Sequence, residues 1–546
     1  MPTLDPILPE NQFIASQLKL RKDLINKDPR LVYPWWRSPC IVRVLLVANE
    51  FLDFGTSDFG LSTFVGVLKN DGRSYVQFAI TLAHRGGFVG NPGVSVERSI
   101  PNFRFDNADH FTADMYDQVW LFGADRGEAE NQLGNGELSI LTDFMDGGGG
   151  VFATGDHGNL GKSLCGSVSR VREMRLWDNS SGKVGMVDPQ RNDTNQIGRN
   201  AGSQFDDQSD DIPQNIAPKM YSSSIGGFWR ETYPHPLLCS PLGRITVLPD
   251  HAHEGECIAP TAAGADFPGS TLPEIIAWST VPSGNNSSGI KQATQSHTFG
   301  AISAYDGHQA GVGRVVTDAT WHHFVNVNLI GEHGFDTDGN RFSGEHPAKQ
   351  HGFLYSAAGQ AHFAQIKHYY VNIAVWISRS TQITCFNNRL IWNLAFHHRV
   401  LEATMNDARL DQNRVSSALM FEIGTHADDV LGRTAGQCRR LKLYLDVLYP
   451  EIPDLIPSID PWVHPFNSER EPELPWINMQ PLFGIALGGG LLAVRDRYMD
   501  DFSPDKVEDG ELEKVFRAGV RNGLARVEES LRGSLAILDS FRRNKG

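Results

Sequence analysis

Short, nearly unbroken apolar runs recur along the first third of the chain, and they constrain its fold more than any other feature. The first is IVRVLLVA at 41–48, and runs at 75–83, 116–125 and 150–155 follow it. Runs of this kind are typical of strands buried on both faces of a parallel sheet. Between two of them, residues 135–148 have apolar side chains at helical spacing and end in glycine. The alternation of strands and helices predicts a doubly wound, mostly parallel α/β domain.

The chain has 546 residues, which is too long for one hydrophobic core and predicts several domains. We expect residues 1–40 to form an extension that packs on the core, residues 41–345 the α/β domain, and residues 346–546 a helical C-terminal domain. Residues 178–235 are polar and weakly periodic, which predicts a long insertion, either a solvated loop or a lid. The charge-paired segment at 509–543 predicts a packed amphipathic helix or a dimer contact, and hence a homo-oligomer through the C-terminal helices.

Composition excludes several classes of function. The net charge of −15 argues against a large nucleic-acid surface, which needs clustered Lys and Arg. The first 25 residues lack the basic start and apolar run typical of a signal peptide, and no apolar stretch reaches membrane-spanning length. The six cysteines show neither CxxC spacing nor a compact disulfide framework. These features predict a cytoplasmic protein that binds neither membranes nor nucleic acids.

The stretch GGGGVFATGDHGNLGKSLCG at 147–166 ends in Gly161-Lys162-Ser163, as a phosphate-binding P-loop would. The P-loop pattern requires a glycine five positions before Gly161, where this chain has Asp156. A carboxylate there would repel the phosphates that the loop must hold. We therefore expect no nucleotide cofactor, and the Asp156-His157 pair becomes the feature of interest.

A helix, a glycine run, an apolar strand and then Gly155-Asp156-His157 resemble the trehalose-utilisation (ThuA-like) branch of the class I glutamine amidotransferase-like fold. GRVVTDATWHH at 313–323 resembles the closing strand of that branch, which runs into a loop with a histidine. The resemblance covers roughly residues 41–330 and implies a flavodoxin-like sheet. In the amidotransferases this turn is a nucleophile elbow, Gly-x-Cys-x-Gly, and here His157 takes the place of its cysteine. The resemblance does not identify a reaction, because folds host many functions.

The missing elbow cysteine makes glutaminase activity unexpected, because that chemistry needs a thiolate activated by a histidine. Cys165 follows within the next expected helix and is interpreted as a small buried residue. A caspase-like protease remains a weaker alternative, since His157-Gly158 follows a strand as in that class. Its cysteine would then be Cys239, which lies in a proline-bounded turn.

Histidine is concentrated in one part of the chain: 12 of the 19 histidines lie between residues 235 and 368. In an extended segment, where side chains alternate, we expect His251, His253 and Glu256 to share one face, and these three residues are the predicted metal ligands. Two such histidines make half of a metal site, for which zinc is the most favoured ion. A zinc-bound water would serve as a nucleophile near neutral pH. The alternative is that these histidines make ordinary loop hydrogen bonds.

The candidate residues follow expected strands, and the carboxyl ends of parallel strands meet at one edge of a sheet. At that edge a carboxylate and an imidazole could act as general acid and base, with or without metal. The predicted catalytic residues are Asp156, His157, Glu254 and His322, and the predicted substrate-binding residues are Asp125, Arg126, Glu128 and His323. We expect either a hydrolase or isomerase for a small polar substrate, such as a carbohydrate or an amide, or a non-catalytic assembly or binding module.

Overall fold

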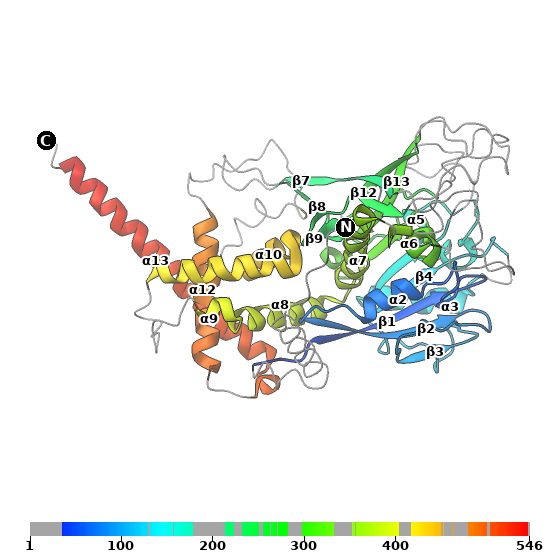
Figure 1. Ribbon diagram of the computed structural model, residues 1–546, viewed down its shortest axis with the longest axis horizontal. Coiled ribbons are helices and arrows are strands. Elements are labelled where there is room, and N and C mark those ends of the chain that lie inside the picture. The colour runs from blue at the N-terminus through cyan, green and yellow to red at the C-terminus, as the bar shows by residue number, and fades with distance from the viewer. Residues whose placement is uncertain are drawn as a thin grey trace, which may run out of the picture. The chain divides into compact units, whose positions relative to one another are not determined.

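The computed structural model divides the chain into two compact units (Figure 1). Unit 1 comprises residues 1–40, 385–431 and 477–546, and unit 2 comprises residues 41–384 and 432–476. The structure describes residues 35–128, 132–156, 158–177, 213–222, 232–249, 255–262, 264–269, 271–281, 297–331, 352–354, 356–402, 416–448, 451, 462, 479–499 and 503–543. The expected division at residue 345 differs from these units, because residues 346–384 and 432–476 belong with the sheet in unit 2.

Unit 2 is built on a ten-stranded sheet with the order β11-β6-β12-β13-β14-β5-β4-β1-β2-β3. In its central part β14, β5, β4 and β1 are parallel neighbours, and β2 and β3 form a further parallel pair. These strands are β1 (Cys40–Ala48), β2 (Val76–His84), β3 (Arg98–Ile100), β4 (Gln118–Phe122), β5 (Gly150–Thr154) and β14 (Val315–Asp318). The α/β class predicted from the apolar runs is confirmed.

The other half of the sheet is antiparallel, which the sequence did not indicate. Strands β14, β13, β12, β6 and β11 each run opposite to the next. Their bounds are β6 (Pro213–Pro218), β11 (Val247–Pro249), β12 (Glu274–Val281) and β13 (His297–Tyr305). Strand β6 comes from the expected insertion at 178–235, so part of that segment belongs to the sheet. Two small pairs complete the strands, namely β7 (Met220–Ser222) with β8 (Thr232–Pro234) and β9 (Cys239–Ser240) with β10 (Gly243–Arg244).

Successive side chains of a strand point to opposite faces of the sheet, and on the parallel strands both faces are buried. Val119 and Leu121 of β4 belong to the core that includes Phe144 of α3 (Asn135–Asp146). Trp120 and Phe122 of the same strand contact Phe64 of α2 (Ser62–Lys69), on the other face. Phe64 in turn packs edge-on against a tyrosine of α7 (Ala357–Trp376). Unit 2 also contains short helices, namely α4 (Lys162–Cys165), α5 (Val171–Met174), α6 (Asn326–Ile330) and the 3-10 turns η3 (Pro236–Leu238), η4 (Gly307–Ala310), η5 (Trp321–His323) and η7 (Gly352–Leu354).

Unit 1 is helical where the structure describes it, in agreement with the expected helical C-terminal region. Its elements include α9 (His398–Glu402), α12 (Met479–Tyr498), η9 (Pro504–Lys506) and α13 (Asp509–Arg543), while α8 (Ser380–Ala395) and α10 (Ser417–Leu448) run across the unit boundaries. Helices α12 and α13 pack closely through glycines: a Cβ on Gly489 would lie 2.6 Å from the Gly519 carbonyl oxygen. The end of α13 exposes Leu531, Leu535 and Leu538. The homo-oligomer expected through these helices stays a prediction.

Four of the six cysteines form disulfides that no local spacing indicated. Cys40 pairs with Cys385 and Cys239 with Cys438, across 345 and 199 residues of sequence. Disulfides are rare in the reducing cytosol. The cytoplasmic location therefore stays a prediction, and the two disulfides count against it.

Among the helices that the structure describes, none is long and apolar enough to span a membrane.

Candidate functional site

Four parallel strands of unit 2 end side by side at one edge of the sheet, which we call the carboxyl edge. The register aligns their last residues Ala48, Phe122, Thr154 and Asp318. Polar residues at or just beyond these ends include Asn49, Asp125, Asp156, Thr320 and His322. The structure thus brings Asp125, Asp156 and His322 to one edge, as their positions after strands predicted.

Asp156 and His322 form the centre of this edge. The Asp156 and His322 side chains are 1% and 6% exposed, and Asp156 Oδ2 lies 3.8 Å from His322 Nε2. The hydroxyl of Thr320 donates to Asp156 Oδ1 at 2.9 Å. On the far side of the imidazole, His322 Nδ1 lies 3.0 Å from Asn328 Oδ1. Because that amide oxygen only accepts, Nδ1 carries the proton, and in the neutral ring Nε2 is then the basic nitrogen that faces Asp156.

His323 has a different environment from its neighbour. Its side chain is fully buried, and Nδ1 lies 2.7 Å from Asp318 Oδ1. The other oxygen of Asp318 accepts a hydrogen bond from Tyr369 at 2.6 Å, and Tyr370 donates to the His323 carbonyl. Burial and the adjacent Asp318 raise the pKa of Tyr369 well above its usual value, so the phenol stays a donor. These contacts are those of a structural network, and the predicted role of His323 in substrate binding stays a prediction.

A buried arginine that sequence reasoning did not select ties the loops of this edge together. The guanidinium of Arg175 donates to the carbonyl oxygens of Asp156, Leu176, Asp318 and Ala319 at 2.7–3.2 Å. It also lies over the Trp177 ring, 4.5 Å from the centroid. Burial lowers the pKa of Arg175. Arg175 therefore fixes the turn after β5 relative to the turn after β14, which sets the spacing between Asp156 and His322.

The Gly161-Lys162-Ser163 segment begins α4, and its backbone donors already have a protein partner. The N–H groups of Ser163 and Leu164 donate to the Asp125 carboxylate at 2.6 and 3.2 Å. Asn49 donates to the same carboxylate at 3.0 Å. Asp125 therefore occupies the position at which a P-loop would hold a phosphate. Its predicted role in substrate binding is untested, but its contacts are structural.

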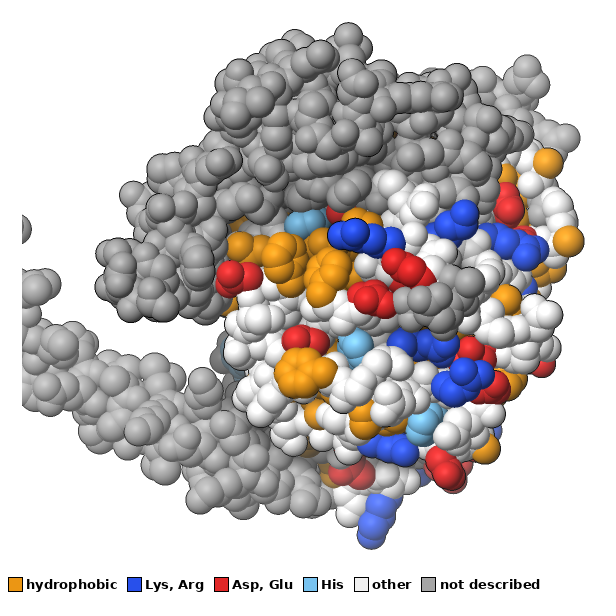
Figure 2. Space-filling view, turned by 90° about the vertical axis from the view of Figure 1, so that its right-hand side faces the viewer, with side chains coloured by type: hydrophobic (Ala, Val, Ile, Leu, Met, Phe, Trp, Pro, Cys, Tyr) orange, Lys and Arg blue, Asp and Glu red, His pale blue; other side chains and the backbone are white. Residues whose placement is uncertain are grey.

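An aromatic group lies beside the catalytic candidates. The Trp321 ring stacks on His322 with a centroid distance of 4.1 Å, and it packs edge-on against Phe51 and Phe59. Phe51 and Phe59 are 51% and 42% exposed, which is unusual for large apolar side chains. Figure 2 shows the side of the molecule toward which α6 lies in Figure 1, with exposed apolar, charged and histidine side chains interspersed. The surface beside His322 therefore offers apolar contacts to a bound molecule.

Several predicted site residues cannot be placed at this edge. His157, His251, His253 and Glu254 lie outside the described residues. Gly255, the next residue along the chain, donates to the Ala319 carbonyl at 3.2 Å, so the chain reaches the edge there. Glu256 is 1% exposed. Arg126 is exposed, and its backbone N–H donates to Glu128 at 2.7 Å.

No group of three or more His, Cys, Asp or Glu side chains that could hold a metal occurs among the described residues. Two of the three predicted metal ligands, His251 and His253, lie outside that part of the chain, so the metal stays a prediction.

The cysteines of the described chain are poor nucleophiles. Cys239, the candidate for a caspase-like mechanism, is bonded to Cys438 and offers no thiol. Cys165 and Cys257 are free and fully buried. Burial raises the pKa of Cys257 to about 12 and that of Cys165 well above its usual value. Both stay protonated near neutral pH, which disfavours thiolate chemistry here.

Comparison with protein-family models, with curated proteins and with solved structures found no match. The site must therefore be interpreted from its own geometry.

Proposed function

We propose that the chain is a hydrolase or isomerase for a small polar substrate, with Asp156 and His322 as its acid–base pair. The proposal rests on one observation: a buried carboxylate faces an imidazole whose other nitrogen is held by Asn328. An anchored imidazole of this kind is well placed to take a proton from water or substrate. Asp156 would then stabilise the imidazolium.

The choice of hydrolysis by water follows from the residues at hand. The buried thiols are protonated, and the Ser163 hydroxyl donates to the Glu128 carbonyl at 2.8 Å rather than to a base. General-base activation of water by His322 needs no protein nucleophile. The resemblance to the ThuA-like branch adds carbohydrates and amides as substrate classes to examine first.

A non-catalytic role is the second candidate, and one observation favours it. Asp156 and His322 are nearly enclosed, and pairs of this kind also occur as structural links between loops. In that case their replacement would affect folding rather than turnover.

The test is a panel of 4-nitrophenyl esters, glycosides and anilides, assayed with wild-type protein and with His322→Gln. We expect kcat/KM for any substrate turned over to fall at least about 100-fold, the usual share of a general base. His84→Gln is the matched control, since His84 is also buried and lies at the end of β2. It should retain turnover.

Thermal unfolding separates the two candidates. A low-activity His322→Gln protein that unfolds at nearly the wild-type temperature supports catalysis. Absence of turnover on the whole panel, with a lowered unfolding temperature in His322→Gln, favours the structural link and the non-catalytic role.

A further inference from the structure

The second half of α13, residues 528–543, is exposed along its whole length. The first half packs on α12, and Leu512, Phe516 and Val520 there are buried. From residue 528 onward every described side chain is exposed, and in Figure 1 this part is the outer end of the red helix. Five of these side chains are large and apolar, with exposed fractions of 43% to 64%: Leu531, Leu535, Ile537, Leu538 and Phe541. So much exposed apolar surface on one element marks an interaction site.

Three of the leucines form a stripe along one face of the helix. Leu531, Leu535 and Leu538 are four and three residues apart, and at about 100° per residue such positions lie on one face. Leu524 continues the stripe, because it precedes Leu531 by the same seven residues that separate Leu531 from Leu538. A seven-residue repeat of this kind is typical of helices that pair along their length. We call Leu524, Leu531, Leu535 and Leu538 the leucine stripe.

Within one chain this part of α13 has little to stabilise it as a helix. Gly533 and three serines between residues 528 and 543 lower its helix propensity. The ion pair of Arg532 with Glu528 is exposed and contributes little. Most helical stability in a protein comes from burial of an apolar face. We therefore expect the leucine stripe to be covered in solution.

The charges beside the stripe indicate the kind of partner. The exposed half of α13 contains three acidic and three basic residues, whereas a helix that lies on lipid headgroups carries mainly Lys and Arg on its polar face. One border of the stripe carries charges of alternating sign, in the order Glu528, Arg532, Asp539 and Arg542. The other border carries serines at positions 530 and 534. The complement of this order of charges is the same order read in the opposite direction.

We propose that the leucine stripe binds a second copy of this chain, with the two helices antiparallel and Leu535 at the two-fold axis. Residues at similar offsets from the axis then meet, so Leu531 lies close to Leu538 of the partner subunit. The homo-oligomer expected from the sequence becomes, in this proposal, a dimer with a defined contact.

The same register pairs the charges of the border. Arg532 lies close to Asp539 of the partner subunit, and Glu528 lies close to Arg542 of the partner subunit. A parallel pair would instead set this border against the serines, because parallel helices bring opposite borders together. Charge complementarity therefore favours the antiparallel direction.

The test measures the molar mass of the full-length protein by light scattering at about 1 to 100 µM, a range in which a weak dimer forms. We expect two chains per particle at the highest concentrations. Leu535→Asp should weaken the dimer at least about 100-fold and leave one chain per particle, because it sets two carboxylates together at the axis. Leu242→Asp is the matched control, since Leu242 is an equally exposed leucine of unit 2. It should form the dimer as the wild-type protein does.

Two cysteine variants test the direction of pairing. Leu535→Cys should form a disulfide between the two subunits on oxidation, since the axis brings these residues together. Leu531→Cys should not, because the two copies of residue 531 would lie about 12 Å apart along antiparallel helices. In a parallel pair both variants would cross-link.

Three outcomes overturn the proposal. They are a single chain per particle up to about 100 µM, a dimer that persists in Leu535→Asp, and cross-linking of both cysteine variants. The first is measured on the wild-type protein and does not depend on any variant folding. A single-chain protein that floats with phosphatidylserine vesicles would assign the leucine stripe to a membrane surface instead.

Discussion

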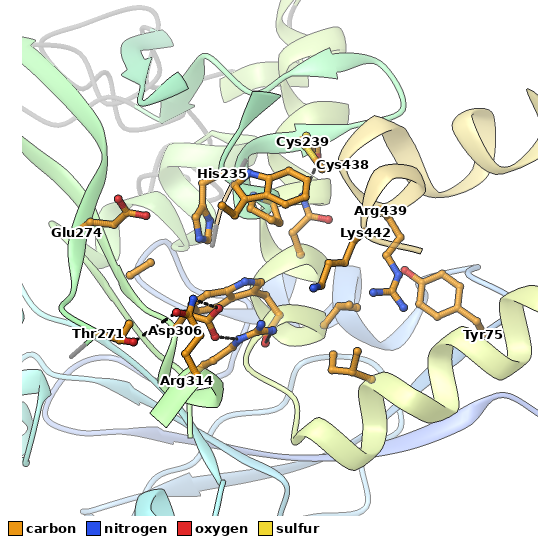
Figure 3. A pocket seen from close by; sticks show the side chains of 18 of the residues that line it. Tyr75, His235, Cys239, Thr271, Glu274, Asp306, Arg314, Cys438, Arg439 and Lys442 are labelled. Atoms are coloured by element: carbon orange, nitrogen blue, oxygen red, sulfur yellow. Dashed lines mark hydrogen bonds and ion pairs between the residues drawn. A yellow bond between two sulfur atoms is a disulfide. The ribbon is translucent and has the colours of Figure 1, made fainter. Parts of the chain in front are cut away.

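The two edges of the sheet in unit 2 use buried charge in opposite ways. At the carboxyl edge, charged side chains bond to one another or to the backbone, as Asp125, Asp318 and Arg175 do. At the amino edge, where the parallel strands begin, Arg73, Arg314 and Lys442 line a cavity and pair with Asp71, Asp306 and Asp446 (Figure 3). A satisfied network fixes the positions of its members, whereas ion pairs around a cavity leave charges of both signs at its wall. The first arrangement suits positioned proton transfer and the second suits binding.

The difference is clearest in two arginines. Arg175 is 0% exposed and donates to four carbonyl oxygens. Arg439 is half-buried, and its guanidinium carbon lies 5.9 Å from the Tyr75 ring centroid. Burial lowers the pKa of both. In Arg175, four hydrogen bonds to backbone carbonyl oxygens offset the loss of hydration.

The largest expected effect comes from replacing these two residues by methionine. Arg175→Met leaves four carbonyl groups without that donor, and each buried one costs about 1–3 kcal/mol, so we expect a loss of at least about 3 kcal/mol. Arg439→Met removes a guanidinium that is only half-buried, so we expect a smaller loss of stability. Urea denaturation of both variants measures the contrast. A similar loss in the two variants would mean that the edges do not differ in this way.

A smaller effect is expected from acid, and it belongs to the amino edge. Burial lowers the pKa of His235 to about 3, while in the unfolded chain it is near 6.5. Below pH 6.5 the unfolded state binds a proton at His235, whereas the folded state does not. Stability is therefore lost as pH falls toward 3. Between pH 6.5 and 5 this amounts to about 2 kcal/mol.

His235→Asn tests this assignment, because an asparagine oxygen can still accept the Leu237 N–H that His235 Nδ1 accepts at 3.3 Å. The unfolding free energy of this variant should fall less steeply over the same pH range. The slope should decrease by the amount that uptake of about one proton on unfolding contributes. His308 and His368, whose pKa values burial lowers to about 3 and about 4, account for part of the remaining slope. An unchanged slope in His235→Asn would show that His235 does not carry the effect.

The carboxyl edge could be located from sequence because its signal is local. Asp125, Asp156 and His322 follow strands that apolar runs mark clearly, and parallel strands end together. Their partners lack such a signal. Asn328 lies six residues beyond His322 and Arg175 follows a short helix, and a lone arginine or asparagine normally predicts surface.

The amino edge had no signal of this kind. Its wall combines Tyr75, His235, Trp376, Arg439 and Trp462, which are separated by up to several hundred residues. The antiparallel half of the sheet brings Glu274 and Asp306 into that wall, and strand direction is not encoded in an apolar run. The Cys239–Cys438 disulfide spans 199 residues, so it could not be predicted from the spacing of the cysteines either.

The smallest expected effect concerns Cys165, which lies at the carboxyl edge and whose thiol bonds a backbone carbonyl there. Its thiol lies 3.7 Å from the Thr154 carbonyl oxygen, and it packs beneath Gly123, where an added Cβ would lie 3.3 Å from the sulfur and 2.5 Å from the Cα of Gly161. Cys165→Ala should therefore cost about 1 kcal/mol of stability, as a small cavity does, and change kcat/KM less than about threefold. Gly123→Ala, which crowds the same contact, should destabilise the turn more. Loss of nearly all turnover in a well-folded Cys165→Ala protein would instead make the thiol part of the mechanism, and the carboxyl edge would no longer depend on Asp156 and His322 alone.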